Sequence, residues 1–141
     1  MNRHRDLLRR VLSLPTAPFV EQSVVSFIQE WAAQRGLDFA TDAAGNVLVR
    51  YAGRRGGKGG PCWVFAAHMD HPGFVSTRQR GLRVWAEFRG GVAAEYFVGS
   101  RVRFIDGAAE AAGVVRRRRE ADKAKGEIFP LCEVELDVPA E

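Results

Sequence analysis

Residues 61–70 decide the fold class of this chain, and they read PCWVFAAHMD. Apolar side chains fill the positions from Pro61 to Ala67, and such a continuous run is typical of a strand that is buried on both faces of a sheet. Ligand sites in α/β proteins lie at the carboxyl ends of such strands, and His68 and Asp70 stand at that end. The stretch therefore predicts an α/β fold with a functional site just after Ala67.

His68 and Asp70 are also the residue types of a metal site. Neutral imidazole is a common zinc ligand, and a nearby carboxylate often accepts a hydrogen bond from the other ring N–H. That bond fixes the tautomer and makes the imidazole a better ligand. On spacing alone, His68 could equally be a structural histidine near a loop. Metal binding by His68 is therefore a hypothesis that the rest of the sequence has to support.

Length and composition set the class of protein. The chain has 141 residues, and its 46% hydrophobic content suffices for one modest domain or for pieces of two. No segment approaches the roughly 18 consecutive apolar residues of a membrane span, and the first residues lack a secretory signal, so we expect a cytoplasmic protein with no membrane partner. Cys62 and Cys132 lie far apart within hydrophobic runs, which predicts buried free thiols.

The formal net charge is +4, and two basic clusters, residues 54–58 and 116–119, contribute much of it. Such clusters can bind nucleic acid, with an affinity that falls steeply with salt. Neither cluster is interleaved with aromatic residues, so we interpret both as basic loops and expect no nucleic-acid partner. The glycine-rich segment around Lys58 has no following Ser or Thr and no following helix, which excludes a phosphate-binding loop.

The first half of the chain predicts helices and then strands. Apolar residues recur at helical spacing over residues 7–12 and again over residues 24–31, where Gly36 follows as a C-cap. Residues 47–51 read as a strand. With the buried strand at residues 61–67, the predicted order is helix, helix, strand, loop, strand.

The second half predicts a small antiparallel β module. Apolar and polar residues alternate over residues 82–89, 101–105 and 132–138, as in strands with one buried face. Asp106-Gly107 is a hairpin signal. We therefore assign residues 1–72 to one domain and residues 73–141 to a second, β-rich domain.

Several short motifs occur in a fixed order along the chain. They are Leu-Pro at the end of the first helix, Glu21 before the second, Asp42-x-x-Gly45-Asn46-Val47, Ala67-His68-Met69-Asp70-x-x-Gly73-Phe74, Phe88-Arg89-Gly90-Gly91-Val92 and Gly99-Ser100-Arg101-Val102. Together they cover most of the chain, and the ordered set is far more specific than any single motif. In this order they resemble the cytosolic zinc- or cobalt-dependent aminopeptidases that include the glutamyl, deblocking and tetrahedral aminopeptidases.

The resemblance implies an αβα-sandwich catalytic domain of the zinc exopeptidases, interrupted by an inserted β-barrel-like domain. Residues 1–72 would be the N-terminal part of the catalytic domain, and residues 73–141 would be part or all of the insert. The resemblance also implies assembly into homo-oligomers.

For the chemistry, the resemblance implies that His68 binds one of two divalent metal ions and that Asp70 is the catalytic residue that orients it. Zinc suits such a site best, and cobalt or manganese would also suit it. Two metal ions about 3.5–4 Å apart activate a water molecule for attack on a peptide bond. The implied reaction is the removal of N-terminal residues from peptide substrates.

The sequence departs from the family in two places. His71-Pro72 stands where the family usually has an acidic residue followed by an aliphatic one, so His71 is either a competing ligand or a surface histidine. In the family, the other metal ligands and the general base follow the insert, and Glu133, Glu135 and Asp137 read instead as solvent-facing charges on a strand. Because catalytic zinc sites use about three protein ligands, we interpret the chain as a truncated metallo-aminopeptidase that is inactive alone.

Three other interpretations stay open. The chain could be a non-catalytic β-rich module, derived from this family, that serves binding or oligomerisation. It could belong to a related zinc exopeptidase, such as a carboxypeptidase or a deacylase, because these share the His-x-Asp strand. It could also bind nucleic acid through residues 116–119, which predicts an affinity that depends on salt.

Overall fold

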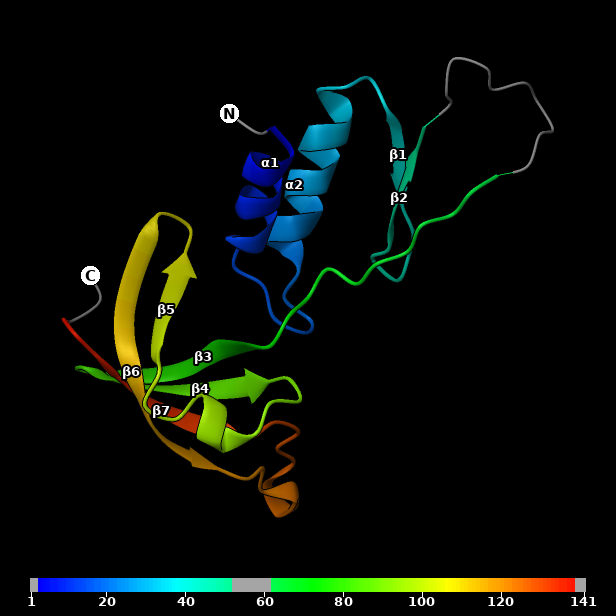
Figure 1. The fold of residues 1–141 in the computed structure, drawn as a ribbon. Coiled ribbons are helices and arrows are strands. Elements are labelled where there is room, and N and C mark those ends of the chain that lie inside the picture. Colours follow the sequence, from blue (N-terminus) through cyan, green and yellow to red (C-terminus); the bar gives the residue numbers. More distant parts are fainter. Residues whose placement is uncertain (1–2, 52–61, 139–141) are drawn as a thin grey trace. The chain divides into compact units, whose positions relative to one another are not determined.

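The computed structural model describes residues 3–51 and 62–138, which fall into two compact units. The first unit is built from the described residues of Met1–Pro15 and Val20–Met69, and the second from those of Thr16–Phe19 and Asp70–Glu141. The first unit contains helices and strands and the second is mainly strands (Figure 1), so the mixed α/β class is confirmed. The assignment of the two halves to a catalytic domain and an insert stays a prediction.

Two amphipathic helices begin the first unit, and both predicted helices are confirmed. They are α1 (Arg3–Leu12) and α2 (Gln22–Ala33), and the guanidinium of Arg10 on α1 lies 5.1 Å from the ring centre of Phe27 on α2. The N–H of Gly36 donates to Ala33 and the N–H of Leu37 donates to Ala32. This is the hydrogen-bond pattern of a Schellman cap, so the predicted role of Gly36 is confirmed. Neither helix has the length and apolar character that a bilayer crossing needs, as far as the described residues go.

A two-stranded antiparallel sheet completes the first unit. It pairs β1 (Asp38–Thr41) with β2 (Val47–Arg50), and Gln29 on α2 donates a 3.1 Å hydrogen bond to Thr41 on β1. The carboxylate of Asp42 accepts hydrogen bonds from the backbone of Ala44 and from the backbone and side chain of Asn46. These hydrogen bonds lower the pKa of Asp42, and the bond from the side chain of Asn46 has the largest effect. The motif around Asp42 is therefore a structural turn between the strands.

The second unit is a five-stranded antiparallel sheet with the strand order β3-β4-β7-β6-β5. Its strands are β3 (Gly73–Arg80), β4 (Arg83–Arg89), β5 (Arg101–Asp106), β6 (Ala109–Arg119) and β7 (Leu131–Leu136), with short 3₁₀ turns at Ala94–Tyr96 and Lys123–Lys125. The sheet curls into a half-barrel (Figure 1). The predicted strands β4, β5 and β7 are confirmed, as is the hairpin at Asp106-Gly107.

One prediction about the second unit is wrong. Arg116–Arg119, interpreted above as a basic loop, forms the end of β6 and pairs with β7. Arg116, Arg117 and Arg119 are exposed while the backbone completes the ladder, and the partly buried Arg118 pairs with the carboxylate of Glu120. The other basic cluster, at residues 54–58, lies outside the described residues, as does the glycine-rich segment that contains Lys58.

One face of the curled sheet forms the core. Its buried members come from β4, β6, β7 and the turn after β4, and they are Val84, Ala86, Phe88, Phe97, Val115, Cys132, Val134 and Leu136. Cys132 is a buried free thiol, as predicted, and its burial raises the pKa of that thiol. Cys62 is exposed, so the prediction of burial is wrong there, because the strand expected to bury it is not formed.

A cluster of charged side chains fixes the connection between β6 and β7. Glu127 receives two hydrogen bonds from the guanidinium of Arg119 and one, of 2.8 Å, from the backbone N–H of Asp122. These donors favour the ionised carboxylate of Glu127, and the hydrogen bonds from Arg119 make the largest contribution to the shift of its pKa. They lower the pKa of Glu127 from 4.5 to about 2.

This pKa predicts an acid-sensitive connection. Because the pKa of Glu127 is lower in the folded chain, its stabilising effect is complete above pH 4.5 and is lost as the pH falls towards about 2. We expect the Glu127→Gln variant to lose thermal stability at neutral pH and to show a smaller further loss across that acid interval than the parent chain. Carboxyl carbon chemical shifts in a pH titration give the pKa directly, and a midpoint for Glu127 near 4.5 would contradict this account.

Candidate functional site

The apolar run that precedes His68 does not form the predicted buried strand. The described residues 62–68 have no strand pairing, and the side chains of Trp63, Val64 and Phe65 are 86%, 78% and 93% exposed. A strand with two apolar faces is stable only where strands and helices cover both faces, and the described residues supply no such cover. The prediction of a buried strand is therefore wrong for this chain, and a run of large apolar side chains meets solvent.

His68 and Asp70 lie where the chain passes from one unit to the next. His68 is exposed and belongs to the first unit, and Asp70 is half-buried and belongs to the second. His71 is also exposed, and its Nδ1 lies 3.3 Å from the carbonyl oxygen of Pro72, as expected of a surface histidine. Within residues 3–51 and 62–138, no three His, Cys, Asp or Glu side chains form a group that could hold a metal ion. His68 and Asp70 alone are too few ligands for a catalytic zinc site, so their metal role stays a prediction.

The residues that follow Asp70 are held in place by two close backbone approaches. A Cβ atom at Gly73 would lie 2.8 Å from the carbonyl oxygen of Thr16, and a Cβ at Gly90 would lie 2.6 Å from a side-chain carbon of Pro72. Real Cβ atoms do not come this close, so both positions require glycine. Gly73 and Gly90 belong to two of the sequence motifs on which the resemblance to the aminopeptidases rests. The structure brings these two motifs together.

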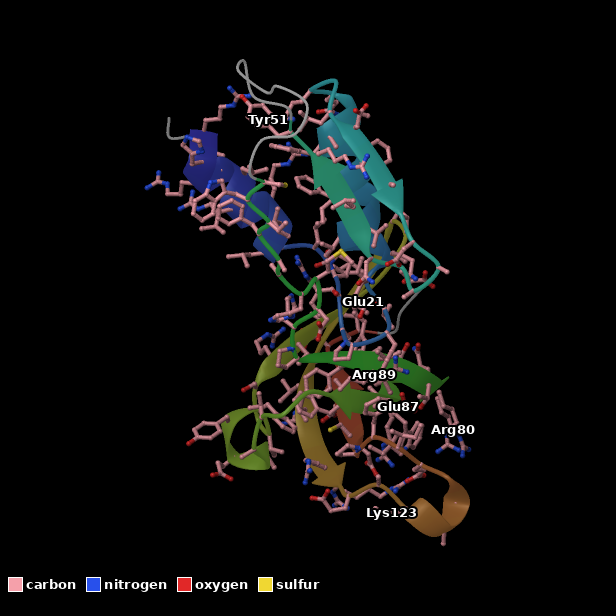
Figure 2. All side chains as sticks on the ribbon, turned by 90° about the vertical axis from the view of Figure 1, so that its right-hand side faces the viewer. Glu21, Tyr51, Arg80, Glu87, Arg89 and Lys123 are labelled. Atoms are coloured by element: carbon pink, nitrogen blue, oxygen red, sulfur yellow. The ribbon has the colours of Figure 1, made fainter. Side chains whose placement is uncertain are left out.

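Arg89 fixes the same region with its side chain. Its guanidinium donates two hydrogen bonds to the carboxylate of Glu87, at 3.0 and 2.7 Å, and one of 3.0 Å to the carbonyl of Pro18 (Figure 2). It also lies 4.9 Å from the ring centre of Phe129. Arg89 therefore ties residues 16–19 to β4.

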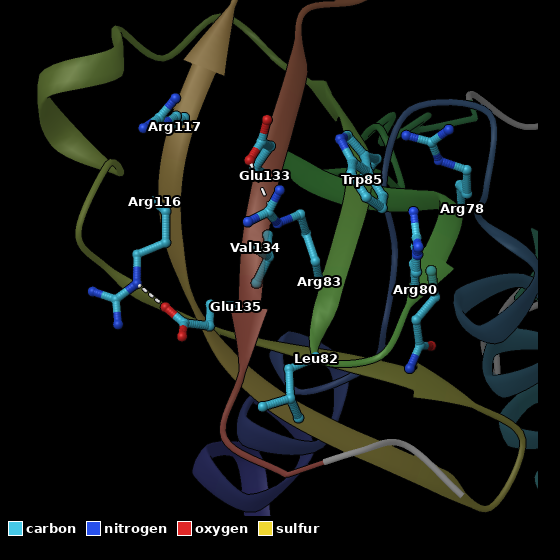
Figure 3. Close-up of a pocket in the computed structure, with 11 residues that line it drawn as sticks. Arg78, Arg80, Leu82, Arg83, Trp85, Arg116, Arg117, Glu133, Val134 and Glu135 are labelled. Carbon is cyan, nitrogen blue, oxygen red and sulfur yellow. Dashed lines mark hydrogen bonds and ion pairs between the residues drawn. The ribbon is translucent and has the colours of Figure 1, made fainter.

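A second candidate site lies on the face of the five-stranded sheet opposite the core. It is a groove of about 1100 Å³ across β3, β4, β7 and β6, and Figure 3 shows arginine side chains along it. The basic cluster at residues 116–119, recognised from the sequence, contributes Arg116 and Arg117 to this groove. The other three arginines, at positions 78, 80 and 83 on either side of Gly81, were not identified from the sequence, although their grouping was a signal.

Comparison with known proteins gives two partial similarities. The chain is 38% identical over 76 residues to a LysW-lysine hydrolase of Deinococcus radiodurans, an alignment that covers 52% of this chain and 19% of the relative. It is 28% identical over 65 residues to a cytosol non-specific dipeptidase of Escherichia coli, covering 46% of this chain and 13% of the relative. No protein-family profile and no solved structure matches the chain.

These similarities support the coarse part of the prediction. Over part of its length the chain is similar to a hydrolase and a dipeptidase of the zinc exopeptidase families. The chain spans less than a fifth of the length of either curated relative. The activity of the whole protein, its substrates and its partners are therefore matters for proposal.

The contacts of Arg89 predict the effect of its removal. We expect the Arg89→Met variant, which keeps an aliphatic stem, to lower the free energy of unfolding by about 1–3 kcal/mol, because Glu87 and Pro18 lose a charged donor. Chemical denaturation measures this loss, and amide hydrogen exchange should quicken at residues 16–19. The matched control is Arg103→Met on β5, because the side chain of Arg103 is half exposed. Equal losses in both variants would show that Arg89 does not fix this region.

Proposed function

We propose that this chain is the N-terminal portion of a metal-dependent aminopeptidase, in which His68 binds one of two divalent metal ions and Asp70 orients its ring. The ordered motifs support this assignment, as do the partial similarities to a hydrolase and a dipeptidase. Zinc is the metal we expect, with cobalt or manganese as alternatives. Peptides with a free N-terminus are the proposed substrates, and a homo-oligomer is the proposed assembly.

The observation that carries the proposal is the exposed apolar run ending at His68. Burying one large aliphatic or aromatic side chain stabilises a protein by about 1.5–3 kcal/mol, and Trp63, Val64 and Phe65 all forgo that gain here. Such a run is expected where a central strand lacks its neighbours. We propose that residues outside these 141 supply the neighbouring strands, together with the remaining metal ligands and the general base.

The residues present fit one part of a metal site. An imidazole with a carboxylate two residues later can provide a metal ligand and the group that orients it. In a completed site, the bound metal ions would polarise the substrate carbonyl and make a water molecule nucleophilic near neutral pH. The proposed contribution of this chain is to bind and orient, and further ligands are needed to complete the site.

A second function is favoured by the same exposed run. If another copy of the chain or a different protein covers Trp63, Val64 and Phe65, the chain would be a non-catalytic module for binding or oligomerisation. The two functions make opposite predictions about hydrolysis by the extended protein.

The test uses two lengths of protein. In the protein extended to the end of its reading frame, we expect hydrolysis of aminoacyl anilides or dipeptides that a chelator abolishes. His68→Ala should remove this activity, and Asp70→Asn should weaken metal binding by about 10- to 100-fold. His71→Ala is the matched control, because His71 is a neighbouring exposed histidine, and it should keep most of the activity.

The 141-residue chain alone should show no hydrolysis that depends on His68. Chelator-sensitive hydrolysis by this chain, lost in His68→Ala, would refute the proposal that its site is incomplete. An extended protein that folds and binds metal without hydrolysing any of these substrates would favour the module.

A further inference from the structure

The groove on the outer face of the five-stranded sheet carries an excess of positive charge. Two carboxylates, Glu133 and Glu135, lie among five guanidinium groups, so three positive charges are in excess. The five arginines are Arg78, Arg80, Arg83, Arg116 and Arg117, and we call this surface the basic groove. All of these residues belong to the second unit, so the groove is a property of that unit alone.

Irregularities in two strands turn arginines onto this face. Between Ser76 and Arg78 the pairing of β3 with β4 shifts by one residue, so Ser76 lies opposite the buried Ala86 and Arg78 lies opposite the outward-facing Trp85. Without this bulge, strict alternation would direct Arg78 and Arg80 to the core face. The bulge therefore adds two guanidinium groups to the basic groove.

The second bulge lies across the sheet on β6. The pairing with β7 shifts between Val115 and Arg117, so that buried Val115 lies opposite Val134 while Arg117 lies opposite Glu133. Arg116, the extra residue, pairs with Glu135 at 2.7 Å on the same outer face (Figure 3). Bulges are over-represented beside functional sites, where they re-aim side chains. Here both bulges in the sheet lead to the same groove.

The carboxylates within the groove neutralise only part of its charge. Arg116 pairs with Glu135, and Arg83 lies 3.8 Å from Glu133. Among the described residues, neither Arg80 nor Arg117 makes an ion pair or a side-chain hydrogen bond. Arg80 also lies directly opposite Arg83, and like charges in that position are destabilising. An anionic ligand would relieve this repulsion.

The arrangement of the groove favours carboxylates over nucleic acid. The guanidinium of Arg78 lies 3.9 Å from the ring centre of Trp85, and that of Arg83 lies 5.9 Å from it. Trp85 is the one aromatic residue among the described residues that line the groove, so its ring is already in contact with cations. Single strands of nucleic acid need open aromatic faces for base stacking. Separate carboxylates can instead pair with individual guanidinium groups in bidentate geometry.

We propose that the basic groove binds an acidic peptide segment of a partner protein, with its carboxylates on Arg80 and Arg117. Four neighbouring strands span roughly 14 Å at about 4.8 Å per spacing, which matches about four residues of extended peptide. A segment with acidic residues along that length has the charge that the groove lacks. The basic groove shares no residue with the metal chemistry proposed for His68, so the two proposals stand or fall independently.

The test measures binding of fluorescein-labelled octaglutamate to the 141-residue chain by fluorescence anisotropy. We expect saturable binding that weakens as salt is added. Replacing both Arg80 and Arg117 by Gln should weaken it about tenfold, since each substitution removes one charge contact in a partly exposed groove. The matched control is the double change Arg101→Gln and Arg103→Gln on β5, which alters net charge equally and should have an effect of about twofold or less.

A further variant should change octaglutamate binding in the opposite direction. Glu133→Gln removes a competing carboxylate and leaves every arginine in place, so it should strengthen octaglutamate binding. Circular dichroism verifies that each variant is folded. Failure of octaglutamate to bind at low salt, or equal weakening in both double variants, would overturn the proposal. Tighter binding of an oligothymidylate of matched charge would also overturn it, in favour of a nucleic-acid surface.

Discussion

The alternation of buried and exposed residues along β4 and β7 is the constraint on which the second unit depends. Val84 lies opposite Val134 and Ala86 lies opposite Cys132, and all four side chains are buried. Because side chains of a strand alternate between its two faces, this register sends the residues between them outward. A slip of one residue would bury charged groups such as Glu133, so the register is strongly fixed. The same register builds the core and the floor of the basic groove.

Those parts of the fold whose side chains follow a regular period were predictable from the sequence. The two helices follow helical spacing, and β4 and β7 alternate throughout, so both patterns were visible without neighbours. The strands β3 and β6 were missed because each contains a bulge that changes the phase of alternation. All four residues of β1 are exposed, so no apolar pattern marked it. These elements depend on their partners in space, which one sequence does not reveal.

The candidate metal site was also only partly predictable from the sequence. The apolar character of residues 62–67 was plain from the sequence, but a strand forms only where other strands offer hydrogen bonds. His68 and Asp70 were identified from their chemistry and their place after that run. Gly73, Arg89 and Gly90 were recognised only as motif residues, and the structure adds the physical reason for each. At Gly73 and Gly90 neighbouring atoms lie too close for a side chain. The guanidinium of Arg89 ties residues 16–19 to β4. The physical roles of these residues come from contacts across the chain.

We propose that the apolar run and His68 belong to a larger catalytic sheet that other residues complete. The most direct measurement is to sequence the gene downstream of the codon for Glu141. The account predicts an open reading frame that continues past this codon and encodes further histidine and acidic residues able to complete a metal site, along with strands that can cover Trp63, Val64 and Phe65. A stop codon at that point, with no such reading frame nearby, would contradict it.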